Sequence, residues 1–140
     1  MAQGDFFGTY DPKEVVLQIG PTLISGYGDG TFITIARDDN EIYKKHVGAG
    51  GEVARTRNNN ISGSITFSIK STSPSRIALD ILKQQPATFP VTVINNSNRK
   101  FTAAAVEAWM KVEPDVEFGD EESMIEYVVD CADLRFATLE

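Results

Sequence analysis

Cysteine and long hydrophobic runs are scarce in this chain of 140 residues, and each shortage excludes a class of protein. The single cysteine, Cys131, excludes an internal disulfide, and its apolar neighbours predict a buried, inert thiol. No apolar run approaches the roughly 18 residues that cross a bilayer, so we expect no membrane binding by the monomer. The first ten residues lack the basic start and apolar stretch of a secretory signal, so we expect synthesis and assembly in a cytoplasm.

Basic side chains are also in short supply. The 13 Lys and Arg residues stand against 20 Asp and Glu residues, and the formal net charge of −7 argues against tight binding to a nucleic-acid backbone. The charges are unevenly spread, because residues 37–60 hold five of the 13 basic residues while residues 107–140 hold 11 acidic and two basic ones. Copies stacked head to tail would set the basic segment of one against the acidic end of the next.

Recognisable catalytic and metal-binding groups are missing from the sequence. The only histidine, His46, has no cysteine or serine nucleophile motif beside it, so we expect no enzyme. Residues 38–41 are rich in carboxylates but lack the alternate spacing and the bidentate glutamate of an EF-hand loop. We therefore predict neither a metal nor a cofactor.

The clearest positive signal is the alternating segment 61–70, Ile-Ser-Gly-Ser-Ile-Thr-Phe-Ser-Ile-Lys. In a strand, its Ile and Phe side chains enter a core, while the opposite face carries a row of small hydroxyls. That row consists of Ser62, Ser64, Thr66 and Ser68. A row of small hydroxyls forms a smooth polar surface along which another molecule can slide. An ordinary strand with one solvent-exposed face is the alternative interpretation of the same pattern.

The first half of the chain otherwise predicts short strands. Strands are expected at residues 15–19, 22–25 and 32–36, in a meander around the glycine-rich turn 26–30. Residues 37–60 hold few apolar side chains, so we expect an extended arm or hairpin that becomes ordered against a neighbouring subunit. A floppy surface loop is the alternative for this segment.

The second half predicts one helix among longer strands. Ser73 and Pro74 begin a helix over about residues 74–85, whose broad apolar arc is expected to pack on a sheet. Residues 89–94 and 100–112 are expected to form a hairpin around the turn 95–98. Six carboxylates within residues 113–122 predict an exposed turn.

The last strand changes phase. Its odd positions from Ile125 to Cys131 are apolar, whereas Leu134 and Phe136 continue on even positions, which predicts a bulge or bend near Ala132. Its other face presents two carboxylates, Glu126 and Asp130, which form an acidic wall or merely a solvated one.

Trp109 is the best single candidate for an interface anchor. In the strand 100–112 one face carries Ala104, Val106, Ala108, Met110 and Val112. The other face, which includes Trp109, is too mixed for simple solvent exposure and is a candidate contact with another subunit. A place in the protein's own core is an equally open interpretation of Trp109.

This order of elements resembles the tail tube (inner tube) proteins of contractile-tailed bacteriophages. The resemblance covers about residues 14–139 and is clearest from Gly63 to Pro74 and in the helix that follows. The related Hcp-type secretion tube proteins share the plan. It implies a mainly β protein, an antiparallel β-sandwich or barrel with one flanking helix. It also implies a single tail-tube domain over residues 1–140, with an N-terminal arm (1–13) and an inter-subunit arm or hairpin (37–60).

The implied function is that of a structural virion protein whose hexameric rings stack into the hollow tail tube for genome delivery. Implied partners are other copies of the chain and the tail sheath, baseplate and terminator proteins, and DNA passes through the lumen without specific binding. The residues expected at inter-subunit or ring-stacking contacts are Arg37, Tyr43, Lys44, Lys45, Arg55, Arg57 and Trp109. The lumen candidates are the hydroxyl row Ser62, Ser64, Thr66 and Ser68, or the carboxylates Glu126 and Asp130. The implied location is the virion tail, assembled in the host cytoplasm.

A different class of function fits parts of the same sequence. A β-sandwich carbohydrate-binding or adhesion module would use Trp109 and Tyr127 as stacking platforms. Such a module would bind glycan as a stable monomer, whereas a tube protein would form rings or filaments.

Overall fold

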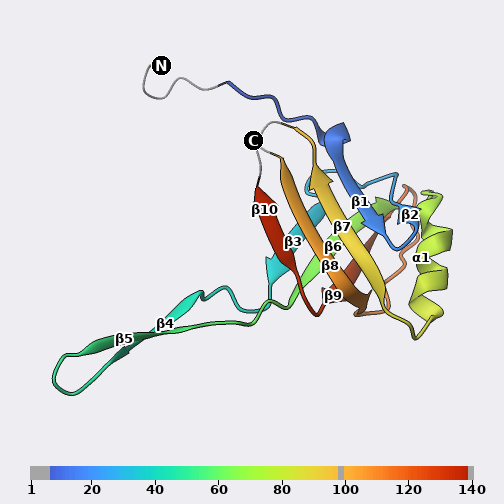
Figure 1. The fold of residues 1–140 in the computed structure, drawn as a ribbon. Helices are drawn as coiled ribbons and strands as arrows, with labels where there is room; N and C mark the ends of the chain where they lie inside the picture. The colour runs from blue at the N-terminus through green and yellow to red at the C-terminus, as the bar shows by residue number, and fades with distance from the viewer. Residues whose placement is uncertain (1–6, 98–99, 139–140) are drawn as a thin grey trace.

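An antiparallel β-sheet, with one α-helix against it, makes up the body of the molecule (Figure 1). The computed structural model describes residues 7–97 and 100–138, so Phe6 of the predicted N-terminal arm and Asn98 of the predicted turn lie outside the described residues. The elements are η1 (a 3₁₀ helix, Pro12–Glu14), β1 (Val15–Ile19), β2 (Thr22–Leu23), β3 (Ile33–Arg37), β4 (Tyr43–Val47), β5 (Val53–Arg57), β6 (Gly63–Lys70), α1 (Ser75–Gln84), β7 (Phe89–Asn95), β8 (Phe101–Met110), β9 (Met124–Cys131) and β10 (Arg135–Thr138).

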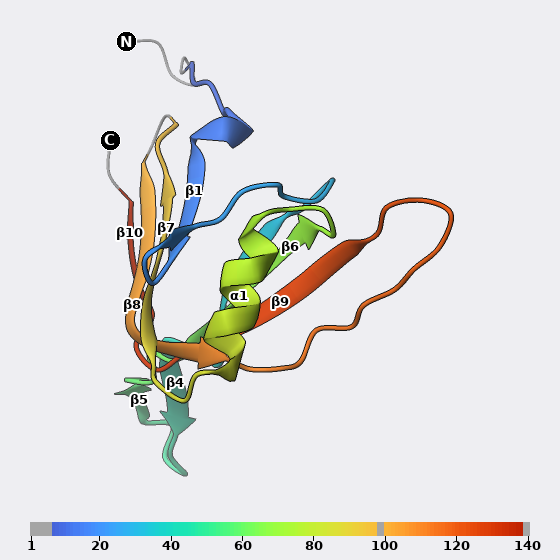
Figure 2. The same ribbon diagram turned by 90° about the vertical axis from the view of Figure 1, so that its right-hand side faces the viewer.

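The main sheet is curled around its core. Its strand order is β2-β1-β7-β8-β9-β6-β3, with β10 paired to β8, while β4 and β5 form a separate two-stranded sheet. Figure 2 shows β1, β7, β8 and β10 as one upright wall from which β6 and β9 turn away, with α1 in the angle between them. The predicted mainly β, antiparallel architecture with a flanking helix is therefore confirmed.

The core takes its side chains from the alternating strands. Ile65, Phe67 and Ile69 of β6 are buried, as predicted. The apolar row of β9 is also buried, and its Tyr127 stacks on Phe67 with the ring centroids 5.5 Å apart. Cys131 is buried, as predicted, and burial raises the pKa of its thiol to about 11.

The early strands do not form the predicted meander. β1 and β2 lie at one end of the sheet, whereas β3 pairs with β6 at the other end. The glycine-rich segment 26–30 closes no tight turn, because its backbone runs beside β6. The Gly28 N–H donates to the Ser68 carbonyl at 3.0 Å, and the Lys70 N–H donates to the Gly26 carbonyl at 2.8 Å. This segment therefore carries the chain from one end of the curled sheet to the other.

The faces predicted for β8 are wrong in the first half of the strand, because a β-bulge shifts the alternation of its side chains. Ala105 is buried and Val106 is exposed, opposite to the prediction, whereas Ala108 is buried as expected. One extra residue of β8 is accommodated between its pairs with β7. The Asp133 carboxylate accepts the N–H groups of Val106 and Glu107 at 3.2 and 3.3 Å, which satisfies the backbone at the bulge.

The predicted bend near Ala132 is a full division of the last strand. β9 ends at Cys131, the chain turns, and β10 pairs with β8 farther along the same edge. Leu134 is fully buried in the turn, and its N–H donates to the Ile61 carbonyl at 2.8 Å. Phe136, expected on the same side as Leu134, is exposed, because β10 begins after this turn.

The helix packs through a narrower face than predicted. α1 begins at Ser75, whose N–H donates to the Ser73 hydroxyl at 3.3 Å. Leu79 is fully buried, but Ile77 and Ile81 are 71% and 53% exposed, contrary to the expected packing of the whole apolar arc. Four residues apart on one helix face, these two isoleucines form an uncovered apolar patch.

Gly63 is the position where a single methyl group is expected to destabilise the sheet. A Cβ there would lie 2.5 Å from the Ala36 carbonyl oxygen and 2.7 Å from Leu134 Cδ2. We expect Gly63→Ala to lower the free energy of unfolding, measured by urea denaturation, by about 1–3 kcal/mol. The matched control Gly119→Ala, where nothing lies within 4 Å, is expected to change it by less than about 0.5 kcal/mol. Equal stabilities of the two variants would contradict this packing.

Candidate subunit-contact and lumen surfaces

The hairpin of β4 and β5 projects from one side of the body (Figure 1). All five residues of each strand are exposed. The turn is well bonded, because the Gly48 N–H donates to the Glu52 carbonyl at 2.7 Å and the Glu52 carboxylate accepts the Gly50 N–H at 3.2 Å. Residues 37–60 thus contain a hydrogen-bonded hairpin, although two strands without a core are marginally stable in water.

One face of the hairpin, the basic face, combines a tyrosine, three cations and two valines. Its members, paired across the strands, are Tyr43 with Arg57, Lys45 with Arg55, and Val47 with Val53. The Arg55 guanidinium carbon lies 4.0 Å from the centroid of the Tyr43 ring, and Arg57 Nη1 donates to the Tyr43 hydroxyl at 3.2 Å. These contacts hold two cations side by side around one aromatic ring.

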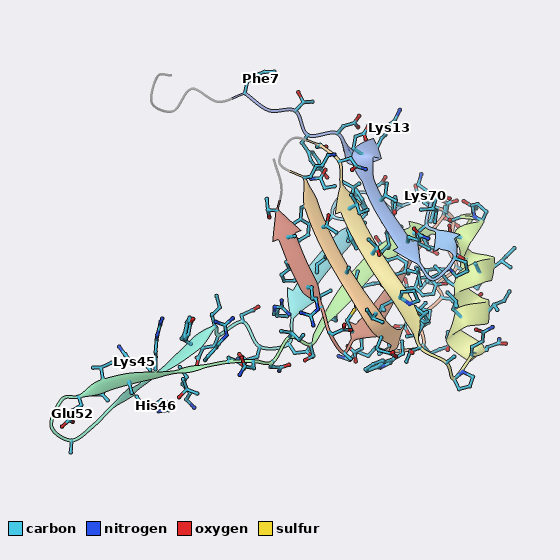
Figure 3. The ribbon with its side chains drawn as sticks, viewed as in Figure 1. Phe7, Lys13, Lys45, His46, Glu52 and Lys70 are labelled. Atoms are coloured by element: carbon cyan, nitrogen blue, oxygen red, sulfur yellow. The ribbon has the colours of Figure 1, made fainter. Side chains whose placement is uncertain are left out.

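The cations of the hairpin form no ion pair among the described residues, although Arg57 borders the same hollow as Asp39 and Glu41. Lys44 belongs to the opposite face, and Figure 3 shows Lys45 and His46 projecting from opposite sides of the hairpin. Within residues 7–97 and 100–138, the ion pairs link Lys83 to Asp80 and Glu113, so no hairpin cation takes part in one. Like charges directly opposite each other, as Lys45 and Arg55 are, destabilise a hairpin until an anion meets them.

The base of the hairpin is tied to its own chain. The Asn58 side-chain amide donates to the Glu41 carbonyl at 2.7 Å. Arg37 Nη1 donates to the Ile61 carbonyl at 2.7 Å, and its guanidinium carbon lies 4.5 Å from the centroid of the Phe136 ring. Arg37 thus engages its own chain and anchors the base of the hairpin, and its predicted contact with another subunit stays a prediction.

The two sets of predicted lumen residues lie on one face of the sheet. In the register of β6 and β9, Ser64 pairs with Asp130 and Ser68 pairs with Glu126. Side chains directly opposite in an antiparallel pair share a face. The hydroxyl row and the carboxylates, which were alternatives in the sequence, form a single surface that we call the hydroxyl–carboxylate face.

Thr66 lies at the centre of this face. It pairs with Thr34 of β3, and both border a hollow of about 310 Å³. Ser62 lies just before β6, and its hydroxyl donates to the Asp38 carboxylate at 2.9 Å. The surface combines the short polar side chains of β6 and β3 with the carboxylates of the adjacent strand β9.

Trp109 lies apart from the hairpin. It pairs with Asp130 in the register of β8 and β9, which places it on the hydroxyl–carboxylate face. Its side chain is 42% exposed, so it is not a core residue. The structure therefore does not bring Trp109 together with the basic hairpin residues with which the sequence grouped it.

A groove between residues 113–122 and β9, the acidic groove, was not predicted. It has a volume of about 460 Å³ and is lined by Val112, Glu113, Pro114, Asp115, Glu117, Met124, Glu126 and Val128. Lys83 Nζ donates to Glu113 Oε1 at 2.7 Å, and this bond raises the pKa of Lys83 and holds the start of the segment on α1. The run of carboxylates was visible in the sequence, but its position over apolar residues of β9 was not.

Tyr127 cannot serve as a carbohydrate-stacking platform. It is 1% exposed, and burial, together with the Asp80 carboxylate, raises the pKa of its hydroxyl to about 12. The predicted alternative, a carbohydrate-binding module, thus loses one of its two aromatic platforms.

Neither a metal centre nor a membrane span is found in the part of the chain that the structure describes. No group of three or more His, Cys, Asp or Glu side chains is arranged there to hold a metal ion. No helix among those residues has the length and apolar character needed to cross a bilayer.

Comparison with known proteins identifies the family. The sequence model of the bacteriophage PhiTE tail tube protein family matches residues 16–137. The chain belongs to this family. No curated protein sequence matches this tail tube protein.

Solved structures share the fold of this tail tube protein. The tube-terminating cap of the anti-feeding prophage superposes with a TM-score of 0.63 at 8% identity, over 99% of this chain and 97% of the cap. A chain of the sheath–tube complex of the extracellular contractile injection system PVC has a TM-score of 0.61 at 10% identity, over 94% of this chain and 93% of that one. The sheath/tube terminator structure of the same system gives 0.61 at 10% identity, over 96% and 99%. The predicted tube-like fold is thereby confirmed.

Proposed function

We propose that this tail tube protein assembles into hexameric rings, and that the rings stack into the hollow tube through which the genome is delivered. The observation that carries the proposal is the hairpin of β4 and β5, which projects from the body and is exposed along both of its paired strands. A hairpin of this kind needs a partner surface to be stable. Tyr43, Lys44, Lys45, Arg55 and Arg57 are the contact residues it offers to adjacent copies.

Free strand edges support closure into a ring. Among the described residues, β3 pairs with β6 alone and β10 pairs with β8 alone, so each leaves one edge without a partner strand there. Such edges invite pairing with another chain. Joining the sheets of neighbouring copies edge to edge would remove them, as in a closed barrel.

The hydroxyl–carboxylate face suits the lining of the lumen. Ser62, Ser64, Thr66, Ser68, Glu126 and Asp130 supply small hydroxyls and negative charge. DNA phosphates find no cation on these side chains, so DNA would pass without specific binding and with little friction. Trp109, at the end of this surface, is proposed to meet the neighbouring subunit.

The remaining partners follow from a role in the tail. The fold neighbours come from contractile injection systems and include a sheath–tube complex and tube terminators. We extend this to the present chain, with a contracting sheath around the tube, a terminator at one end and a baseplate at the other. The role is mechanical and non-enzymatic, in the virion tail, after assembly in the host cytoplasm.

Removal of the hairpin tests self-assembly. The Asn58 N–H lies 2.8 Å from the Ile42 carbonyl, so two glycines can replace residues 43–57 without strain on the body. We expect the full chain to form rings or tubes in sedimentation and negative-stain microscopy, and the shortened chain to remain a folded monomer with an unchanged thermal midpoint. Normal tubes from the shortened chain would contradict the role of the hairpin.

A positively charged side chain at the centre of the hydroxyl–carboxylate face tests whether this face lines the lumen. We expect phage carrying Thr66→Lys to build tails of normal length but to infect poorly, because the ammonium groups bind the passing phosphates. Thr66→Glu, of similar size and opposite charge, is the matched control and should infect like wild type. Plaque counts and ejection assays measure both, and full infectivity of the lysine variant would place this face outside the lumen.

A further inference from the structure

We infer that the basic face of the hairpin of one copy docks in the acidic groove of a second copy. The inference rests on the proposed self-assembly and names the surface that receives the hairpin. It assigns the groove between residues 113–122 and β9 to a defined segment of the same protein. Glu126 lines this groove and also belongs to the hydroxyl–carboxylate face, so the docked hairpin would lie at the border of the proposed lumen.

The side chains on the basic face of the hairpin are aromatic and cationic near its base and apolar near its tip. Arg55 and Arg57 surround the Tyr43 ring near the base, and Val47 faces Val53 next to the turn. All of these side chains are exposed, and both valines are among the exposed large hydrophobic residues. The surface that covers them must therefore offer carboxylates beside an apolar floor.

The acidic groove offers that combination. Val112 and Met124 are exposed apolar residues of its lining, and Asp115 and Glu117 supply carboxylates beside them. Glu113 is already bonded to Lys83, which fixes the start of the segment against α1. Among the described residues, Asp115 and Glu117 take part in no ion pair, so their charges are available to the hairpin.

The two surfaces cannot meet within one copy. In Figure 1 the hairpin extends to the lower left, whereas α1 and the loop of residues 111–123 lie on the right. Figure 2 shows residues 111–123 as a loop that leads away from the body, far from the hairpin. A contact between two different surfaces of identical chains propagates from copy to copy, and it therefore yields a closed ring or an open stack. The uneven charge of a chain with net charge −7 favours the same pairing.

Charge reversal on each side tests the contact in the full chain. We expect Arg55→Glu with Arg57→Glu, and separately Asp115→Lys with Glu117→Lys, to raise the concentration needed for assembly by about tenfold or more. The four substitutions together should restore most of the assembly, because the opposite charges then face each other again. Sedimentation velocity and negative-stain microscopy provide the readout.

The matched control reverses charges in the same segment outside the groove. Asp120→Lys with Glu121→Lys makes the same change in net charge and is expected to assemble like wild type. If this control loses assembly equally, or if the groove variant assembles normally, the hairpin does not dock there, and the proposed tube function still stands. If the wild-type chain never assembles at any ionic strength, the docking and the proposed function both fall.

A crosslink measures the proximity directly. Val53→Cys and Val112→Cys chains, mixed under oxidising conditions, should form a disulfide between copies, because docking brings the two positions within the roughly 7 Å that a disulfide spans. Buried Cys131 does not compete for the crosslink. Val53→Cys mixed with Asp120→Cys is the control. Equal crosslinking in the two mixtures would overturn the docking site.

Discussion

The exposed hairpin of β4 and β5 is the part of the molecule that most needs a partner surface. Two strands can satisfy each other's backbone groups, but they cannot bury enough apolar surface to offset the entropy of ordering them. The hairpin also gathers Lys45, Arg55 and Arg57 on one face, where none of them forms an ion pair with another described residue. Both deficits are removed by contact with an apolar and acidic surface. Because we assign that surface to another copy, self-assembly completes a structure that the isolated chain leaves unfinished.

One face of the curled sheet builds the core, and the other face is free for contacts outside it. Each strand alternates between its two faces, so β6 sends Ile65, Phe67 and Ile69 into the core and Ser64, Thr66 and Ser68 to the other side. Residues on the outer face can therefore be substituted without leaving a cavity in the core. The same body holds the hairpin on one side and the acidic groove on the other, each fixed by contacts to the sheet or to α1. A rigid body between two complementary surfaces is what a stacked or ring-shaped assembly requires.

Local patterns predicted the elements well, whereas their placement depended on contacts between distant residues. The alternation of residues 61–70 and of β9 identified strands and their core faces, because burial on one face imposes a period of two. The bulge in β8 was missed because it is held by Asp133, more than 25 residues further along the chain. The position of β3 depends on the hydrogen bonds that join segment 26–30 to β6. The exposure of Ile77 and Ile81 depends on which face of the helix meets the sheet. The acidic groove was likewise beyond local reasoning, since it joins residues of a loop to residues of β9.

Amide hydrogen exchange measures the dependence of the hairpin on other copies most directly. We predict that amides of β4 and β5 exchange almost without protection in the monomer and become strongly protected in assembled material. Amides of β6 and β9 should be protected in both states, because the core of the monomer already holds them. Equal protection of the hairpin in monomer and assembly would contradict the claim that another copy covers it.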